Sequence, residues 1–445
     1  ITGDFIMKLG TKKNIYTIFA LAIPIIVENV LQSLLGTTDT YFAGKLADNA
    51  IAGISVTNLI MNIFISFFST ISIGTTAVVS RNYGKKNFKN VNISIANSII
   101  LGLILGVIIS LISFLFRVPI LKISRIEKEV INYAMPYYLI VVVPSVFLCL
   151  QLILSSCLRS IKDTKTPMYV TAFSNILNII LNIVFITMGL GVFGLGLATT
   201  LSRLVGMSIL FFKLKNHDEN IHFNFKEVNR KDFFIILNIG IPAGIEKLIM
   251  RIGQLIYNSM IISIGTASYV AHNIAGVIEG YSYIPSMGFG VAIATLMGIA
   301  LGENNPLKAK KQTILTYYAS TISMVVIGII FFVFAPQLAS IFTKTKEIQE
   351  IVIKVLRIIA FFQPFSSMVQ IMTYALQGAG DTKFPMYSTF IGIWGIRIGI
   401  GYVLGVYCKL GLSGVWYAYA IDVMVRGILL FIRFKIGKWK RISIN

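Results

Sequence analysis

The stretch Leu158–Met168, LRSIKDTKTPM, returns as LQGAGDTKFPM at Leu376–Met386. The two copies share the pattern Asp-Thr-Lys-x-Pro-Met and begin 218 residues apart (376 − 158 = 218). A fixed offset between similar segments is the mark of an internal repeat. This repeated stretch therefore predicts that the chain consists of two related halves.

Two further pairs of segments keep the same offset. AIPIIVE at Ala22–Glu28 returns as GIPAGIE at Gly240–Glu246, so that each copy carries a proline and, four residues later, a glutamate. YGKKN at Tyr83–Asn87 returns as LGENN at Leu301–Asn305, with its glycine and last asparagine in register. Three landmarks in one register indicate a duplicated unit of about half the chain.

The composition places most of this chain in lipid. Of its 445 residues 56% are hydrophobic and only 13% are charged, and the mean hydropathy is +0.80. A soluble domain with so few charges would lack the polar surface that keeps it in solution. The runs Ser94–Phe116 and Thr313–Phe334 contain no charged residue, and each is long enough to cross a bilayer.

Apolar runs between charged or Gly/Pro-rich breaks predict an all-α polytopic membrane protein with twelve transmembrane helices, six in each of two pseudo-symmetric lobes. Prolines well inside three of the runs, Pro24, Pro242 and Pro285, are the expected kink points. The expected spans are 15–43, 52–80, 91–116, 131–158, 167–189, 193–213, 233–263, 269–299, 312–342, 351–377, 384–407 and 411–433.

The longest polar stretch, Lys213–Asp232, lies between the two halves. It predicts an N-lobe of residues 1–213, a cytoplasmic linker of residues 214–231 and a C-lobe of residues 232–445. An even number of spans in each lobe gives both lobes the same orientation in the membrane.

Basic residues in the loops predict the orientation of the chain. With both termini in the cytoplasm, 24 Lys and Arg lie inside, 8 lie outside and 7 lie within spans (24 + 8 + 7 = 39). This bias favours a multi-pass protein of the cytoplasmic membrane with cytoplasmic N- and C-termini. Since the excess of basic over acidic residues, 39 against 18, is accounted for by these loops, we expect no nucleic-acid partner. We expect a monomer in membrane lipid.

Acidic side chains inside spans are costly and mark functional sites in membrane proteins. Each acid has an alternative in which it pairs with an intramembrane base, and for Asp422 an ion pair with Arg426, four residues later, is favoured. The acids within the expected spans are Glu28, Asp39, Glu246, Glu279 and Asp422.

The first span carries a polar stripe. Glu28, Gln32 and Asp39 are 4 and 7 residues apart, which places them on one face of a helix. Such a stripe faces a cavity or another helix rather than lipid. Asp39 is the strongest candidate for a functional acid. For Glu28, a functional role and a role in helix packing are about equally favoured.

The fifth span carries three asparagines, Asn175, Asn178 and Asn182, on one helix face. Carboxamide oxygens are hard ligands that suit a small cation such as sodium. Hydrogen bonding across helices explains the same spacing equally well.

In the second half, Glu246 and Glu279 serve either to bind a cationic substrate or as acids neutralised by the nearby bases Lys247 and Arg251.

Motifs of enzymes are missing from the sequence. It contains no Walker A motif, nucleophile elbow or HExxH, and its loops are too short for an enzyme domain. We therefore expect a transporter without enzymatic activity and without a cofactor, driven by an ion gradient.

With the repeat and the twelve spans in hand, the chain resembles the multidrug and toxic compound extrusion family over almost its whole length. The residues that carry the resemblance are Pro24 with Asp39 in TTDTYFAG, the GIPAGIE segment, the two glycine–asparagine loops and the two DTK-x-P-M turns. The resemblance implies two six-helix lobes around a V-shaped central cavity. It also implies an antiporter that exports small organic cations in exchange for sodium or protons.

By position, the resemblance assigns roles to single residues. Asp39 matches the acid of the N-lobe, Asn178 and Asn182 match polar positions of the fifth helix, and Thr199 matches a polar position of the sixth. A sodium ion would lie at Asp39 and Asn178. In some members the position of Asn182 is an aspartate, so its absence disfavours a relay of two carboxylates for protons and favours sodium. Glu246 matches an acid of the C-lobe, but the tenth helix lacks the aspartate that some members carry.

The resulting hypothesis is alternating access, in which cation binding at Asp39 repacks the first helix near Pro24 and releases the drug outward. The alternative is a lipid-linked oligosaccharide flippase of a related superfamily, whose cavity would be lined by arginines such as Arg251 and Arg397. A third hypothesis is a channel or a membrane scaffold that carries out no uphill transport.

Overall fold

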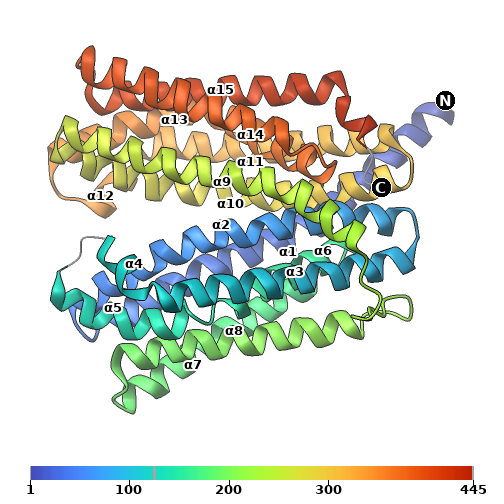
Figure 1. The fold of residues 1–445 in the computed structure, drawn as a ribbon. Coiled ribbons are helices and arrows are strands. Elements are labelled where there is room, and N and C mark those ends of the chain that lie inside the picture. Colours follow the sequence, from blue (N-terminus) through green and yellow to red (C-terminus); the bar gives the residue numbers. More distant parts are fainter. Residues whose placement is uncertain (1, 124–126, 443–445) are drawn as a thin grey trace. The chain divides into compact units, whose positions relative to one another are not determined.

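The computed structural model describes residues 2–123 and 127–442, and all regular elements in this part of the chain are helical (Figure 1). The helices are α1 (Thr2–Gly44), α2 (Asp48–Gly84), α3 (Phe88–Leu115), α4 (Arg117–Ile123), α5 (Lys128–Val141), α6 (Val146–Ser160), α7 (Lys165–Thr187), α8 (Gly191–Lys215), α9 (Arg230–Ile264), α10 (Thr266–Gly302), α11 (Pro306–Val333), α12 (Ala335–Phe342), α13 (Lys346–Gly378), α14 (Lys383–Phe390), α15 (Gly411–Ile436), the π-helical segments η1 (Ile391–Ile400) and η2 (Val403–Tyr407), and the short 3₁₀ helix η3 (Lys438–Arg441).

The number of membrane spans agrees with the prediction. In the described residues, eleven helices are long and apolar enough to cross a membrane, and there are twelve if α5 and α6 form one bent span. Each of the twelve expected segments overlaps one of these spans. The all-α polytopic fold is thereby confirmed.

The fourth span bends by 48° between Val141 and Val146. Pro144 lies in this break and has no N–H to donate, and Ser145 and Phe147 bond only to the third residue before them. The expected kink points did not include this proline. At Pro24, Pro242 and Pro285 the helices α1, α9 and α10 continue without a break.

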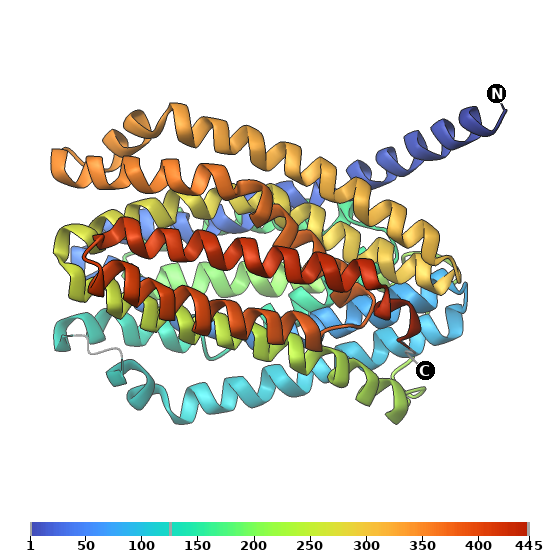
Figure 2. The ribbon, with the colours of Figure 1, turned by 90° about the horizontal axis from the view of Figure 1, so that it is seen from above.

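The ninth expected span, 312–342, is not a single helix. α11 ends at Val333, and the short α12 starts at Ala335 with a proline at its second position. A proline in the first turn of a helix costs no hydrogen bond there but cannot continue the helix before it. α13 follows and packs beside α11 along much of its length (Figure 2).

The repeated Asp-Thr-Lys-x-Pro-Met stretch forms the same turn twice. In the α6–α7 turn Lys162 has φ 72°, and in the α13–α14 turn Gly380, 218 residues later, has φ 89°. The next residue, Asp163 or Asp381, donates its backbone N–H to the carbonyl five residues earlier, at 3.0 and 2.8 Å. The left-handed residue and this backbone hydrogen bond thus end one helix in both halves, shortly before the next helix begins.

Contacts divide the chain into two compact units, one formed by residues 1–26 with 242–445 and the other by residues 27–241. The divisions lie two residues after Pro24 and directly before Pro242, which are equivalent positions of the repeat. α1 and α9 therefore each pass from one unit into the other beside a proline. The predicted lobe boundaries at 213 and 232 follow the repeat instead and stay a prediction.

In the unit of residues 27–241, the start of α9 crosses α2 at backbone contact. A Cβ added to Gly74 would lie 2.3 Å from the carbonyl oxygen of Ile236, and one added to Gly240 would lie 2.2 Å from that of Thr70. Only glycine allows two helices to approach this closely.

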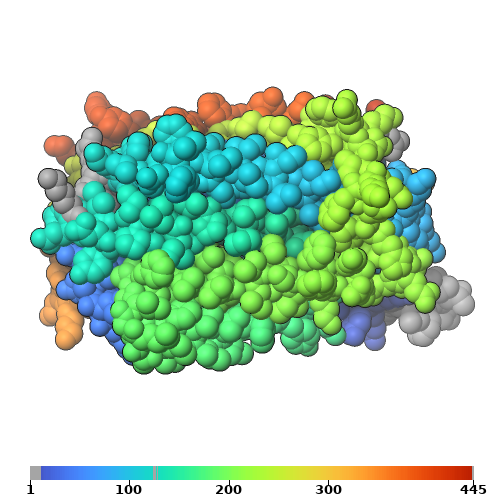
Figure 3. Space-filling view, turned by 60° about the horizontal axis from the view of Figure 1, so that its bottom comes forward, coloured from blue at the N-terminus to red at the C-terminus, as the bar shows by residue number. Residues whose placement is uncertain are grey.

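The segment between α8 and α9 packs on the same unit, where it covers the ends of α3 and α8 (Figure 3). Asn92 of α3 donates to the carbonyl oxygen of Asn220 at 3.1 Å, and Ser94 donates to Asp232 at 3.0 Å. Ile221 and Phe223 are buried. This segment is therefore a packed connection rather than a free tether.

Candidate functional site

A buried carboxylate lies among four helices of the unit of residues 27–241. Asp39 of α1 is 1% exposed and accepts three hydrogen bonds from three other helices. Tyr137 of α5 and Thr199 of α8 donate to its Oδ2 at 2.8 and 2.6 Å. Asn182 of α7 donates to its Oδ1 at 3.1 Å. The carboxylate is thus held by donors that carry no charge.

The asparagines of α7 extend this cluster. Asn178 donates to the Thr199 hydroxyl at 3.1 Å and accepts from Asn182 at 3.1 Å. The side-chain oxygen of Asn182 is buried without a hydrogen-bond partner. A buried oxygen without a partner is costly, so it marks a place where a ligand would be favourable.

Of the predicted coupling residues, Asn178, Asn182 and Thr199 meet at Asp39. Asn175 does not join them, because its amide donates to the backbone oxygen of Leu31 at 2.6 Å.

Sequence reasoning missed Tyr137, the third donor to Asp39. It lies 98 residues away in an apolar run without any polar pattern, so no local signal connects it to Asp39. Arg203 of α8 is a basic residue within the expected span 193–213. It lies near enough to Asp39 for an electrostatic interaction, but it forms no ion pair with it within 4.0 Å.

Ion pairs separate the acids of the spans into two groups. Glu28 pairs with Arg159 at 2.6 Å, and Asp422 pairs with Arg397 and Arg426, each at 2.7 Å. The predicted ion pair between Asp422 and Arg426 is confirmed. Within the described residues, the three span acids without an ion pair are Asp39, Glu246 and Glu279.

The repeat places Glu28 and Glu246 at equivalent positions with different partners. Arg159 and Gln377 are equivalent as well (159 + 218 = 377), and Gln377 donates to Glu246 at 3.1 Å. Thr389 donates to the other oxygen of Glu246 at 3.0 Å. The first half thus neutralises this glutamate with a guanidinium, whereas the second half only hydrogen-bonds it.

Gln32, one turn after Glu28, donates to it at a long 3.4 Å. Gln32 itself is exposed, while Glu28 is buried. The polar stripe predicted for the first helix therefore reaches three different environments: an ion pair at Glu28, an exposed amide at Gln32 and the donor cluster at Asp39.

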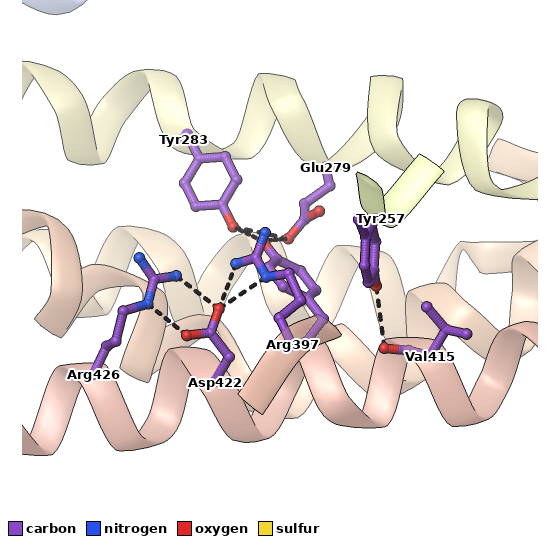
Figure 4. Close-up of polar contacts among 8 residues, drawn as sticks. Tyr257, Glu279, Tyr283, Arg397, Val415, Asp422 and Arg426 are labelled. Atoms are coloured by element: carbon purple, nitrogen blue, oxygen red, sulfur yellow. Dashed lines mark hydrogen bonds and ion pairs between the residues drawn. The ribbon is translucent and has the colours of Figure 1, made fainter. Parts of the chain in front are cut away.

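A second polar cluster lies in the unit of residues 242–445 (Figure 4). Glu279 of α10 accepts from Tyr283 at 2.8 Å and from Tyr419 of α15 at 2.6 Å, and the two hydroxyls also contact each other. Arg397 of η1 lies over the ring of Tyr419, 4.1 Å from its centre, and pairs with Asp422. This cluster holds two acids and two arginines in one buried network.

The two clusters differ in the charge that they hold. Around Asp39, carboxylate, amide and hydroxyl oxygens converge, and such oxygens are the ligands that hard cations prefer. Rotation of the Asn182 amide by half a turn would exchange its N–H groups for its oxygen. The described residues at this place can thus hold either a proton on Asp39 or a small cation among four oxygens.

Comparison with known proteins supports the duplication. The MatE family model matches residues 24–184 and again residues 242–403. The two matches start at Pro24 and Pro242, which keeps the offset of 218 residues (242 − 24 = 218). The internal repeat that the sequence predicts is therefore also a repeat of the family model.

Named relatives align over nearly their full length. The probable multidrug resistance protein NorM of Thermotoga maritima is 33% identical over 95% of this chain and 92% of its own. The uncharacterized transporter YisQ of Bacillus subtilis is 28% identical and covers 95% of both chains.

Solved structures share the fold. Crystal structures of MATE in the bent and in the straight conformation both superpose with a TM-score of 0.90 at 24% identity, over 96% of this chain. Proteins of this family are transporters and not enzymes. The chain belongs to the MatE family, the multidrug and toxic compound extrusion transporters, as a multi-pass membrane protein.

Proposed function

We propose that this protein is an antiporter that exports organic cations and takes up a coupling cation at Asp39. The observation that carries the proposal is a buried carboxylate that forms no ion pair within 4.0 Å and is ringed by three uncharged donors. A buried acid in this setting exchanges a proton or a metal cation, because no ion pair holds it permanently charged. The names of the relatives, which include multidrug resistance proteins, support export of drugs.

We propose sodium rather than protons as the coupling ion. The side-chain oxygens of Asp39, Asn178, Asn182 and Thr199 would coordinate it, after the Asn182 amide has turned its unpartnered oxygen inward. Proton coupling remains the alternative, in which Asp39 alone titrates and the asparagines only hold the helices together. Asn175 would contribute by fixing α7 to the backbone of α1.

Glu246 and Glu279 are our candidates for a substrate or second acidic site. Both are buried and lack an ion pair, so no basic side chain neutralises either carboxylate directly. Glu28 is less suited, because Arg159 already neutralises it, and Gln32 would contribute an exposed amide beside it.

Pro24 is the proposed hinge, since α1 leaves one packing unit and enters the other two residues after it. In this proposal each of the two lobes contains six spans, and both termini lie in the cytoplasm. The protein works as a monomer that uses alternating access.

One of the two arginines that the flippase alternative would use is already paired with an acid. Arg397 is paired with Asp422 and is therefore not free to bind a pyrophosphate. Arg251 is exposed and contacts Gln254 at 3.4 Å, so it alone keeps this alternative open.

Efflux of a fluorescent organic cation from proteoliposomes tests the proposal. Sodium and proton gradients are imposed separately on the wild type, on Asp39→Asn and on the control Asp48→Asn, an acid at the start of α2. Sodium-driven efflux that only Asp39→Asn abolishes supports the proposal. Efflux driven by protons alone moves the assignment to the proton alternative, and efflux driven by neither gradient contradicts antiport.

A further inference from the structure

The counterpart of the Asp39 site in the second half has a different composition. The repeat offset places Tyr257 at the position of Asp39 (39 + 218 = 257). It also places Ile396 and Ile400 at the positions of Asn178 and Asn182. The second half therefore lacks every side-chain ligand that α1 and α7 supply in the first half.

A guanidinium occupies this region instead. Arg397 extends from η1, the counterpart of the middle of α7, and its Nε and Nη2 bond to Asp422 Oδ2 at 2.8 and 2.7 Å. Segments with π-helical winding are rare and frequent at functional sites, and the winding turns side chains to directions that an α-helix would not give them. The arginine is partly buried, with 17% of its side chain exposed.

Two tyrosines and two acids surround this guanidinium (Figure 4). Arg397 lies 4.1 Å from the ring centre of Tyr419 and 5.9 Å from that of Tyr257. The ring of Tyr419 carries the hydroxyl that bonds Glu279, so this tyrosine links Glu279 to the arginine that Asp422 pairs directly. Aromatic faces and a carboxylate around a planar cation are the chemistry of an organic-cation site.

Asp422 is bonded by Arg426 on its other side, with Nε at 2.7 Å and Nη2 at 3.0 Å. Its charge is therefore still balanced by one arginine if the other side chain leaves. Arg426 lies on the same helix as Asp422, four residues later, and would hold it in place.

We propose that the second half contains a cation cage, formed by Tyr257, Tyr419, Asp422 and Glu279, which the protein fills with its own Arg397. The cage is the counterpart of the ion site at Asp39, and its tethered cation leaves no place for a second coupling ion. Each transport cycle then takes up one coupling ion, at Asp39 only. This inference rests on the proposed antiport and adds its stoichiometry.

Chemical rescue tests the cage itself. In Arg397→Ala the guanidinium is removed but the tyrosines and both acids stay, so free guanidinium or methylguanidinium at millimolar concentration should bind the vacated cage. We expect a rise in melting temperature and a several-fold recovery of transport, with no such effect of sodium or potassium. Arg251→Ala is the matched control, because that arginine is exposed and contacts only Gln254 among the described side chains.

The double variant Arg397→Ala/Asp422→Asn separates a cage from unspecific salt effects. Since it removes the carboxylate that the free cation would bind, guanidinium should no longer rescue it. The proposed cage is overturned if guanidinium rescues the double variant as well as it rescues the single variant. It is also overturned if guanidinium does not rescue an Arg397→Ala protein that folds well. If Arg397→Ala does not fold, Arg397→Lys keeps a tethered cation, and guanidinium should then leave its melting temperature unchanged. Stabilisation of that variant by guanidinium overturns the cage as well.

Coupling stoichiometry tests the consequence in the wild-type protein. Proteoliposomes receive gradients of the coupling ion and of a monovalent drug that point the same way across the membrane, so that the two gradients drive the exchange in opposite directions. If one ion exchanges for one drug, net flux is zero when the two concentration ratios are equal. A balance at the square of the ion gradient means two ions and overturns the inference. The inference is also overturned if the Asp39→Asn variant still binds the coupling ion and the additional substitution Glu279→Gln abolishes this binding.

Failure of the proposed function gives a different result. In that case neither ion gradient drives efflux in the wild type, and no balance point exists. A wild type that is driven by an ion but balances at two ions contradicts only the cage.

Discussion

The Asn182 amide donates to Asp39 Oδ1 at 3.1 Å while its own oxygen is buried without a hydrogen-bond partner. The asparagine therefore satisfies the carboxylate only by leaving one of its atoms unsatisfied. A cation between the two side chains would satisfy both oxygens.

We expect Asn182→Asp to change the ion that drives transport. A second carboxylate beside Asp39 cannot remain charged in the buried site unless a cation or a proton joins the pair. The variant should hence gain efflux driven by a proton gradient, while Asn182→Leu should lose at least ten-fold in sodium-driven efflux. Efflux measured with each gradient alone decides this, and unchanged sodium dependence of Asn182→Leu would contradict the proposed ligand set.

Tyr137→Phe should alter ion binding, because it removes one of two donors to Asp39 Oδ2. A lost hydrogen bond to a buried carboxylate costs about 1–3 kcal/mol, so we expect a clear shift of the ion concentration that gives half-maximal efflux. Tyr138→Phe is the matched control. The neighbouring hydroxyl donates to the backbone of Ser113 at 3.1 Å and does not reach the site. Equal effects of both variants would indicate a loss of stability only.

The ion pair of Glu28 and Arg159 predicts a non-additive pair of substitutions. Arg159→Gln leaves a buried charge without a partner, which costs about 3–5 kcal/mol, and should lower the melting temperature strongly. In Arg159→Gln/Glu28→Gln no charge remains, so most of this loss should be recovered. Thermal unfolding in detergent measures both variants, and additive losses would show that the pair is not coupled.

These residues also show how far sequence reasoning reaches. Pairs one or two turns apart on one helix, such as Asn178 and Asn182, are predicted because helical spacing fixes their common face. The repeat predicts the turns at Asp163 and Asp381, because the same sequence makes the same local bonds. Partners on other helices are a different matter. Tyr137 and Arg159 reach their acids across 98 and 131 residues, and only packing brings them there.

The prediction for Asp422 illustrates the same limit. Its local partner Arg426 followed from the spacing, whereas Arg397, 25 residues before it, depends on the π-helical segment η1. No pattern in the sequence of that segment distinguishes it from an α-helix. The bend at Pro144 escapes sequence reasoning for a related reason. Several prolines lie within spans, and the sequence does not distinguish those at an interruption, Pro144 and Pro336, from those inside a continuous helix.

The two prolines at the unit boundaries predict a shared hinge. Pro24→Ala and Pro242→Ala each restore a backbone N–H where α1 and α9 pass from one packing unit to the other. We expect each variant to slow drug efflux several-fold while drug binding stays within two-fold of the wild type, because a stiffer helix resists the conformational change. Pro285→Ala, in the interior of α10 and away from both boundaries, is the control. Equal rates for all three variants would contradict the hinge.

Gly240→Ala should separate α2 from the start of α9. Its Cβ would lie 2.2 Å from the backbone oxygen of Thr70, and since that oxygen belongs to a helix, the helices themselves must move apart. Overpacking of this kind costs about 1–3 kcal/mol, so we expect a lower melting temperature and, because the two helices come from different halves of the repeat, slower transport. Gly276→Ala is the control, since nothing lies within 4 Å of its added methyl group. There the substitution should stabilise α10 slightly, through the higher helix propensity of alanine. A Gly240→Ala protein as stable as Gly276→Ala would show that the crossing of α2 and α9 is not held at backbone contact.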